Sequence, residues 1–200
     1  RKGIAPPAAP RSIVTSDNTL ENELLGITVN SNGTFDLVDK RSGQKYQNLA
    51  SLEDTSEFGD PWNRVTEEGE APITSLGIRA RIEPLGNGPL AGTIRCVYTL
   101  PLPASRGDGK VRSSERVDIP VTLEVTLRKG SPYAEATLRI DNRAMDHRLR
   151  VLFPSRLSAA THAVADGQFD VISRPIQRPD ATGWKEAPYP TNPMWSWVDV

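Results

Sequence analysis

The sequence predicts an all-β protein, a large antiparallel β-sandwich. Short segments in which apolar and polar residues alternate are separated by turn residues roughly every ten positions, as in sandwich domains. No window combines a sustained helical period with capping residues. The longest alternating segment, Val117–Leu127, places an apolar residue at every second position and indicates a long half-buried strand.

The first strands are expected around a tight hairpin. Ile27–Asn30 and Phe35–Asp39 both have strand character, and Asn32 and Gly33 lie between them. Asn-Gly readily supplies the positive φ angles of a hairpin turn. A second glycine turn then leads to a third strand at Gln44–Gln47.

Later segments continue the alternating pattern. Two polar segments, residues 50–72 and 105–116, are predicted to be exposed loops, and the first carries seven acidic residues against one arginine. Further strands are expected at Ile73–Leu85, Thr93–Leu102, Val117–Leu127, Ala134–Asn142, His147–Leu157 and Gln168–Ile176.

The composition excludes two classes of partner. The 200 residues include 24 basic and 25 acidic residues, which leaves a net charge of -1. Such a balance creates no general attraction for nucleic acid or an anionic membrane, so we expect neither partner. No apolar run approaches the roughly 18 residues of a membrane span.

The single cysteine and the two ends bear on location and domain organisation. Cys96 alone excludes an intrachain disulfide and fits a reducing compartment, so a cytoplasmic location is expected. The N-terminal segment lacks the apolar run of a signal peptide. We expect residues 1–19, rich in Pro and Ala, to be a linker from an upstream domain. Residues 20–200 are then the β-sandwich domain, cut at its C-terminal end, where an apolar strand-like run stops.

Candidate catalytic residues are scarce. The only histidines, His147 and His162, show no metal-ligand spacing, and no nucleophile elbow of the form G-x-S-x-G occurs. His147 is interpreted as a polar surface residue at the start of a strand. No catalytic or metal-binding residue is therefore predicted.

The acidic loop contains the candidate binding residues. Asp60, Trp62 and Asn63 place an indole between a carboxylate and an amide. Carboxylate and amide groups can hold sugar hydroxyls, and an indole can stack on the C–H face of a sugar ring. We predict these three residues to bind substrate; the alternative is a solvated loop with one anchoring tryptophan.

An ordered set of motifs resembles the β region of glycoside hydrolase family 38, the family of α-mannosidases and mannosylglycerate hydrolases. The resemblance covers about residues 20–200. Its motifs are Leu20–Leu25, Ile27–Asn30, Asn32–Thr34, Asp39–Gly43, Leu52–Asp54, Gly59–Asn63, Asp141–Ala144, Asp146–Pro154, Phe169–Pro175 and Trp197–Val200.

This resemblance implies that catalysis belongs to a different domain of the parent protein. Family members are retaining enzymes whose zinc and Asp nucleophile lie in an N-terminal barrel, followed by a helical bundle and a galactose mutarotase-like sandwich. None of the family's zinc-ligand or nucleophile motifs occurs in these 200 residues. Zinc is therefore expected in the catalytic domain of the parent protein and no cofactor in this part. The acidic loop would reach the bound sugar, with Trp62 as the aromatic residue against it.

Three functions remain open. The first is a non-catalytic sandwich that supports an upstream catalytic domain of the same chain and lends a loop to a mannose-containing carbohydrate. The second is a stand-alone carbohydrate-binding module, in which Trp62, Trp184, Trp195 or Trp197 form a stacking platform. The third is a mutarotase-like epimerase, which requires a His acid and a Glu base in one concavity.

Overall fold

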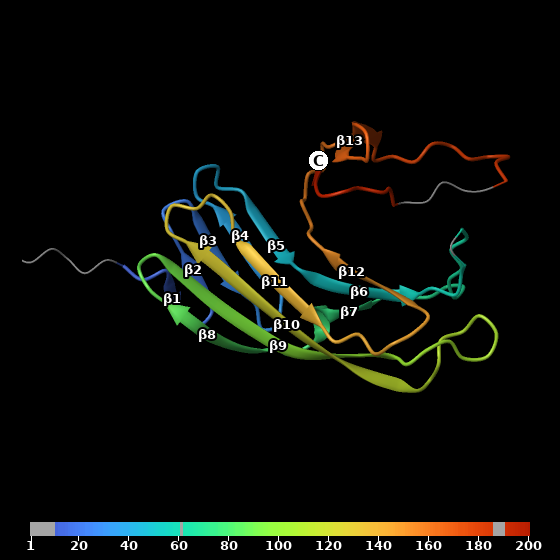
Figure 1. The fold of residues 1–200 in the computed structure, drawn as a ribbon, viewed down its shortest axis with the longest axis horizontal. Helices are drawn as coiled ribbons and strands as arrows, with labels where there is room; N and C mark the ends of the chain where they lie inside the picture. The colour runs from blue at the N-terminus through green and yellow to red at the C-terminus, as the bar shows by residue number, and fades with distance from the viewer. Residues whose placement is uncertain (1–10, 61, 186–190) are drawn as a thin grey trace, which may run out of the picture. The chain divides into compact units, whose positions relative to one another are not determined.

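The structure is a computed structural model that describes residues 11–60, 62–185 and 191–200. Its strands pair antiparallel throughout, and the only helical element of the described part is a single 3-10 turn, η1 (Ser75–Gly77). The chain divides after Pro154 into two compact units, each described by itself. The predicted all-β class with antiparallel sheets is confirmed (Figure 1).

The first unit contains two larger sheets. The five-stranded sheet follows chain order and consists of β1 (Val14–Ser16), β2 (Thr19–Glu21), β3 (Leu25–Val29), β4 (Phe35–Asp39) and β5 (Lys45–Leu49). The four-stranded sheet has the order β11-β10-β9-β8 and consists of β8 (Arg81–Asn87), β9 (Ala91–Pro103), β10 (Arg116–Arg128) and β11 (Glu135–Ile140).

The long strands β9 and β10 are the central strand pair of this unit. Each has 13 residues, and they pair without interruption from Arg116 opposite Pro103 to Arg128 opposite Ala91. Alternate residues of both strands are buried, as the period-two pattern predicted. Their inward residues Ile94 and Leu123 pack against the five-stranded sheet, so the two sheets form a sandwich.

A third sheet covers the other half of the long strands. It has the order β12-β6-β7 and consists of β6 (Ser51–Ser56), β7 (Ile73–Thr74) and β12 (His147–Leu152). Leu52 of β6 and Leu149 of β12 pack with Leu100, Leu102 and Ile119 in a second core cluster. This sheet positions the candidate site, because the acidic loop leaves it at the end of β6.

The second unit, residues 155–200, is a small three-stranded sheet. Its order is β14-β13-β15, with β13 (His162–Asp166), β14 (Val171–Pro175) and β15 (Val198–Asp199). The Asp166 carboxylate accepts hydrogen bonds from the backbone N–H groups of Trp195, Ser196 and Trp197 and from the Ser196 hydroxyl. These bonds hold the segment before β15 against β13.

The predicted first hairpin is confirmed. Strands β3 and β4 pair from Leu25 opposite Asp39 to Val29 opposite Phe35. Gly33 has φ +82, and a Cβ at this position would lie 2.5 Å from Cε1 of Tyr98. Glycine is therefore required here both for the left-handed backbone and for the close approach of Tyr98.

Several predicted boundaries differ from the structure. Residues 51–56, assigned to the acidic loop, form strand β6; its inward residues Asp54 and Ser56 are polar, so the apolar alternation is missing. Residues 11–19 were assigned to a linker, yet Ile13 and Val14 are buried and β1 begins at Val14. Residues 1–10 of the predicted linker lie outside the described residues.

The predicted strand at residues 73–85 also differs in detail. Residues 73–85 contain β7, the turn η1 and only the first part of β8.

Candidate functional site

The acidic loop has a closed stem. At its base the backbone N–H of Phe58 donates to the carbonyl oxygen of Val65 at 2.7 Å. The Glu57 carboxylate accepts the backbone N–H of Val65 at 3.1 Å and forms an ion pair with Arg64 Nε at 3.0 Å. The two limbs of the loop are thereby held together, and residues 58–60 and 62–65 lie beyond the end of β6.

The tip of the loop is an Asx turn made by the predicted residues. Asp60 Oδ1 accepts the backbone N–H groups of Trp62 at 2.8 Å and Asn63 at 2.7 Å, and Asp60 N–H donates to the Asn63 carbonyl at 3.0 Å. The two bonds that Asp60 Oδ1 accepts, that from Asn63 first, lower the pKa of Asp60. A Cβ on Gly59 would lie 1.8 Å from the Asn63 carbonyl oxygen, so only glycine allows this closure.

The turn presents one large aromatic surface to solvent. The Trp62 side chain is 83% exposed, although tryptophan is a residue that usually buries most of its area. Asp60, Trp62 and Asn63 therefore occupy one turn, with the indole displayed and the Asp60 carboxylate acting as the cap that shapes it. An exposed indole beside a carboxylate and an amide is a suitable surface for a sugar ring.

A buried polar network lies at the base of the acidic loop, where the loop leaves β6. Asp54, whose side chain is fully buried, forms ion pairs through one oxygen with Arg112 and through the other with His147. The Arg112 and His147 side chains are only 8% and 4% exposed. The second nitrogen of His147, Nε2, lies 3.1 Å from Asn142 Oδ1.

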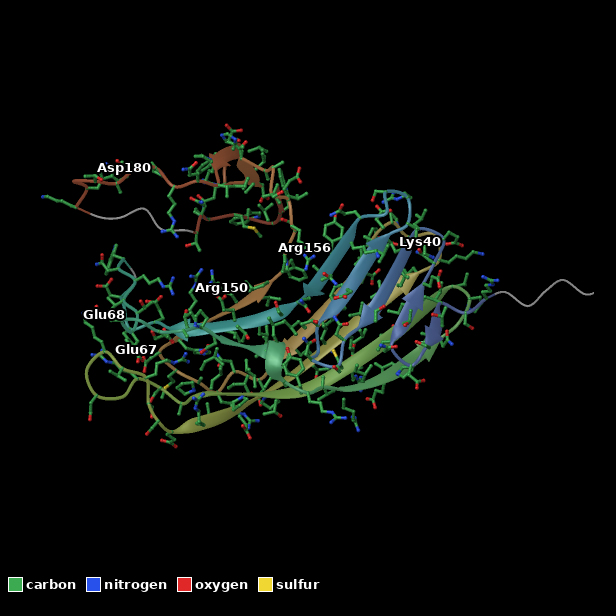
Figure 2. The ribbon with its side chains drawn as sticks, turned by 180° about the vertical axis from the view of Figure 1, so that it is seen from behind. Lys40, Glu67, Glu68, Arg150, Arg156 and Asp180 are labelled. Atoms are coloured by element: carbon green, nitrogen blue, oxygen red, sulfur yellow. The ribbon has the colours of Figure 1, made fainter. Side chains whose placement is uncertain are left out.

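The network also fixes the returning limb of the acidic loop. Arg112 Nη1 pairs with Glu70 Oε1 at 2.9 Å, and Glu70 Oε2 accepts the Ser56 hydroxyl at 2.6 Å. The backbone N–H of Arg112 donates to Glu67 at 2.8 Å. Figure 2 shows Glu67 and Glu68 beside the loop that precedes β10, from which Arg112 comes.

The sequence prediction for His147 was wrong. It is not a polar surface residue, since its side chain is enclosed between Asp54 and Asn142. Both ring nitrogens and both Asp54 oxygens have partners in the protein, and neither residue lines the two cavities described below. The His–carboxylate pair therefore has a structural position under the loop rather than an open, reactive one.

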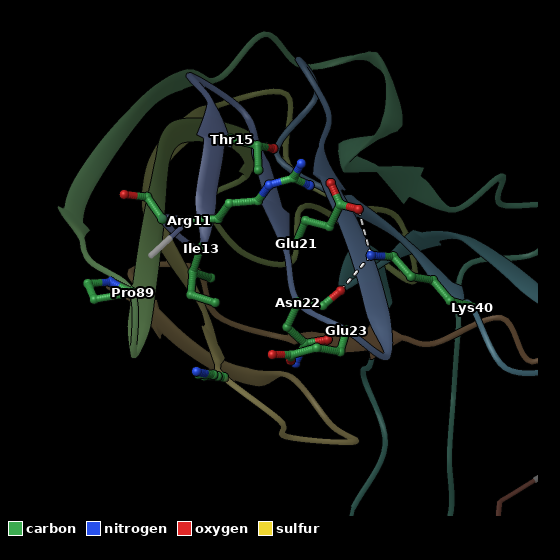
Figure 3. A pocket seen from close by; sticks show the side chains of 10 residues that line it. Arg11, Ile13, Thr15, Glu21, Asn22, Glu23, Lys40 and Pro89 are labelled. Atoms are coloured by element: carbon green, nitrogen blue, oxygen red, sulfur yellow. Dashed lines mark hydrogen bonds and ion pairs between the residues drawn. The ribbon is translucent and has the colours of Figure 1, made fainter. Parts of the chain in front are cut away.

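One cavity lies in the first unit, far from the acidic loop. Its volume is about 390 Å³, and Arg11, Lys40, Glu21 and Lys129 contribute charged walls. Lys40 Nζ is already held by the Glu21 carboxylate at 2.6 Å and by the carbonyl oxygen of Asn22 (Figure 3).

The second unit contains a more apolar cavity of about 450 Å³. Phe169, Met194 and Trp195 line it, and the three side chains are 97%, 52% and 72% exposed. The other predicted tryptophans of this unit, Trp184 and Trp197, are 58% and 42% exposed. The hydrogen bonds from Asp166 hold the Trp195 segment in place.

The described residues also bear on metal sites, membrane spans and epimerase chemistry. Among residues 11–60, 62–185 and 191–200, no three His, Cys, Asp or Glu side chains gather as metal ligands. In that part of the chain there is likewise no helix of the length and apolarity that would cross a bilayer. His162 is exposed and contacts only the neighbouring Thr161 hydroxyl through Nδ1, so the histidine that an epimerase requires is not placed in a described cavity.

Comparisons with known proteins agree on one family. The family model described as the glycosyl hydrolases family 38 C-terminal domain matches residues 20–200. A protein of Halalkalibacterium halodurans with the provisional name mannosylglycerate hydrolase is 31% identical over 175 residues. That match covers 80% of this chain and 19% of the relative, so this chain spans about a fifth of the relative's length.

Two solved structures from Enterococcus faecalis have the same fold. An α-mannosidase matches with a TM-score of 0.85 and 26% identity, over 95% of this chain and 23% of that protein. A family 38 glycosyl hydrolase matches with a TM-score of 0.77 and 25% identity, over 82% of this chain and 22% of that protein. The family match and the fold lead to the same conclusion: this chain belongs to glycosyl hydrolase family 38 and corresponds to its C-terminal domain.

Proposed function

We propose that this chain is the non-catalytic β-sandwich of an α-mannosidase-like retaining glycoside hydrolase, and that its acidic loop contacts the sugar. The observation that carries the proposal is the Asx turn that displays Trp62, 83% exposed, between Asp60 and Asn63. The names of the relatives, an α-mannosidase and a mannosylglycerate hydrolase, support mannosides as substrates.

The chemistry of the loop suits binding rather than bond cleavage. A retaining glycosidase needs two carboxyl groups about 5 Å apart around the glycosidic bond. Asp60 is committed to the backbone of its own turn, and the buried carboxylates Asp54 and Glu70 are committed to Arg112. We assign the two catalytic carboxyls, and the expected zinc, to a catalytic barrel.

Two partners follow from this proposal. The first is the catalytic domain upstream in the same chain, against which the sandwich is a rigid support. The second is a mannose-containing carbohydrate, whose ring stacks on Trp62. We also propose a cytoplasmic location, in keeping with the one cysteine, Cys96, which is buried as a free thiol.

Hydrolysis of an aryl α-mannoside tests the proposal. The 200-residue chain alone should show no turnover, whereas the full-length protein should release the phenol. Turnover by the isolated chain would show that the catalytic groups lie within it and would overturn the assignment. An inert full-length protein would overturn the proposed substrate class.

The cavity of the second unit favours one alternative, a carbohydrate-binding module. Phe169 and Trp195 are exposed aromatic walls of a 450 Å³ cavity, as a sugar platform requires. Tryptophan fluorescence of the isolated chain, titrated with mannose or mannan, distinguishes the two functions. A saturable change at millimolar sugar or below that Trp195→Ala abolishes supports the module; a flat titration supports the hydrolase domain.

A further inference from the structure

The connection between β9 and β10, residues 104–115, is a folded extension of their hairpin. Arg106 and Arg112 form an antiparallel bridge within it. Directly opposite residues of an antiparallel pair have their side chains on the same face. The extension therefore directs two arginine side chains to one side. Its two limbs are joined by backbone hydrogen bonds from Ala104 N–H to the Glu115 carbonyl at 2.9 Å, from Ser113 N–H to the Ser105 carbonyl at 2.9 Å and from Gly107 N–H to the Val111 carbonyl at 2.8 Å.

The two arginines contact opposite limbs of the acidic loop. Arg112 holds the returning limb through Glu67 and Glu70. The guanidinium carbon of Arg106 lies over the ring of Phe58 on the outgoing limb, 5.5 Å from the ring centroid. Like charges directly opposite one another in a β-pair are unfavourable, so each arginine needs a partner of its own. The carboxylates are the partners of Arg112, and the π face of Phe58 is the partner of Arg106.

Both members of this cation–π pair are anchored to Asp146. Its Oδ2 accepts the backbone N–H of Arg106 at 2.9 Å. Its backbone carbonyl accepts the N–H of Glu57, the residue before Phe58, at 3.0 Å. The Arg106 side chain is held in turn through its Nε–H, which donates to the carbonyl oxygen of Gly109. Hydrogen bonds therefore fix the backbone on both sides of the contact between the guanidinium and the ring.

Phe58 is the residue from which the Asx turn starts. Its N–H closes the loop stem on Val65, and Gly59 and Asp60 follow directly in the chain. Trp62 is 83% exposed, so the indole contributes little packing that could orient the turn. The orientation of the turn therefore depends on contacts at the stem, and Arg106 provides one of them from the β9–β10 extension.

We propose that Arg106 is a positioning residue of the sugar site: its guanidinium, stacked on Phe58, fixes the direction in which the Asx turn presents Trp62. This inference rests on the proposed function, since the group that Arg106 orients is the indole assigned to the sugar. A cation–π contact at an exposed site corresponds to a factor of about two to five in an equilibrium constant. Loss of the Arg106 cation should therefore weaken sugar binding by about that factor and leave the chemical step unchanged.

The test is steady-state hydrolysis of an aryl α-mannoside by the full-length protein. Arg106→Gln should raise KM about threefold at an unchanged kcat, which is the signature of a lost binding contact. Phe58→Leu keeps an apolar side chain without a π face and should raise KM to the same extent. Arg106→Lys keeps a cation over the ring and should retain most of the wild-type affinity. The matched control is Arg116→Gln, at the start of β10, where an exposed arginine donates to the Pro101 carbonyl at 3.4 Å; its KM should equal that of the wild type.

The same substitution in a Trp62→Ala background shows whether Arg106 acts through the turn. Once the indole is absent, Arg106→Gln should cause no further rise in KM. An unchanged KM in Arg106→Gln beside a raised KM in Trp62→Ala overturns the inference and leaves the proposed function standing. An equal rise in both backgrounds, or a Lys variant as impaired as the Gln variant, also overturns it. A Trp62→Ala variant with wild-type kinetics overturns the proposed function and the inference with it.

Discussion

Replacement of Arg112 by Met tests the role of the buried network under the acidic loop. Arg112 bridges Asp54 and Glu70, and their side chains are 8%, 0% and 11% exposed. Removal of one partner from a buried ion pair leaves an uncompensated charge and costs about 3–5 kcal/mol. Because these groups are almost completely enclosed, solvent screening reduces this value little. We expect Arg112→Met to lower the free energy of unfolding by about 3–5 kcal/mol.

The assay is urea denaturation of the 200-residue chain followed by far-UV circular dichroism. Hydrogen exchange of the amides in β9 and β10 locates the loss in the first unit. Arg139→Met is the control, since its pair with Glu124 involves a side chain that is 65% exposed and should change stability by less than about 1 kcal/mol.

A second variant separates the charge imbalance from lost packing. In the double variant Asp54→Asn, Arg112→Met one of the two buried carboxylates that lose Arg112 is neutral, so it should be more stable than Arg112→Met alone. If Arg112→Met unfolds at the same urea concentration as Arg139→Met, the network does not hold the loop base and the reasoning is refuted.

Three further predictions concern the loop tip, the second unit and the core thiol. Gly59→Ala should speed proteolysis of the acidic loop, because its Cβ would meet the Asn63 carbonyl at 1.8 Å; an unchanged digestion rate would contradict the need for glycine at this position. The pKa of Asp166 is lowered to about 2, chiefly by the Ser196 hydroxyl, so this contact is fully formed above pH 4 and is lost as pH falls through 2. NMR of the Ser196 amide should follow that transition, and a midpoint near 4 would refute it. Burial raises the pKa of Cys96 to about 11, so Ellman's reagent at pH 8 should label it only after unfolding, and rapid labelling of the native chain would argue against this core position.

The long strands could be predicted because each has one apolar face against a core. In β10 the residues Ile119, Val121 and Leu123 are buried, and the alternation of the sequence follows directly from that burial. Strand β6 could not be found in this way, since its inward residues include Asp54 and Ser56, which are satisfied by partners distant in sequence.

The candidate site likewise combines residues that are close together in the sequence with residues that are far apart in it. Asp60, Trp62 and Asn63 are close in sequence, and a local turn brings them together, so composition alone pointed to them. The network under the loop joins Asp54 and His147, 93 positions apart, through strand pairing that no single segment reveals. The only local signal was the alternation of charged residues at the start of β12.

Truncation of Trp62 in the full-length protein tests the central claim most directly, namely that this domain lends its loop to the sugar site. An aromatic contact at the centre of a binding surface contributes about 2 kcal/mol, so Trp62→Ala should lower kcat/KM for an aryl α-mannoside about thirtyfold. The melting temperature should not change, because the side chain is 83% exposed in the isolated domain. An unchanged kcat/KM in Trp62→Ala would contradict the account.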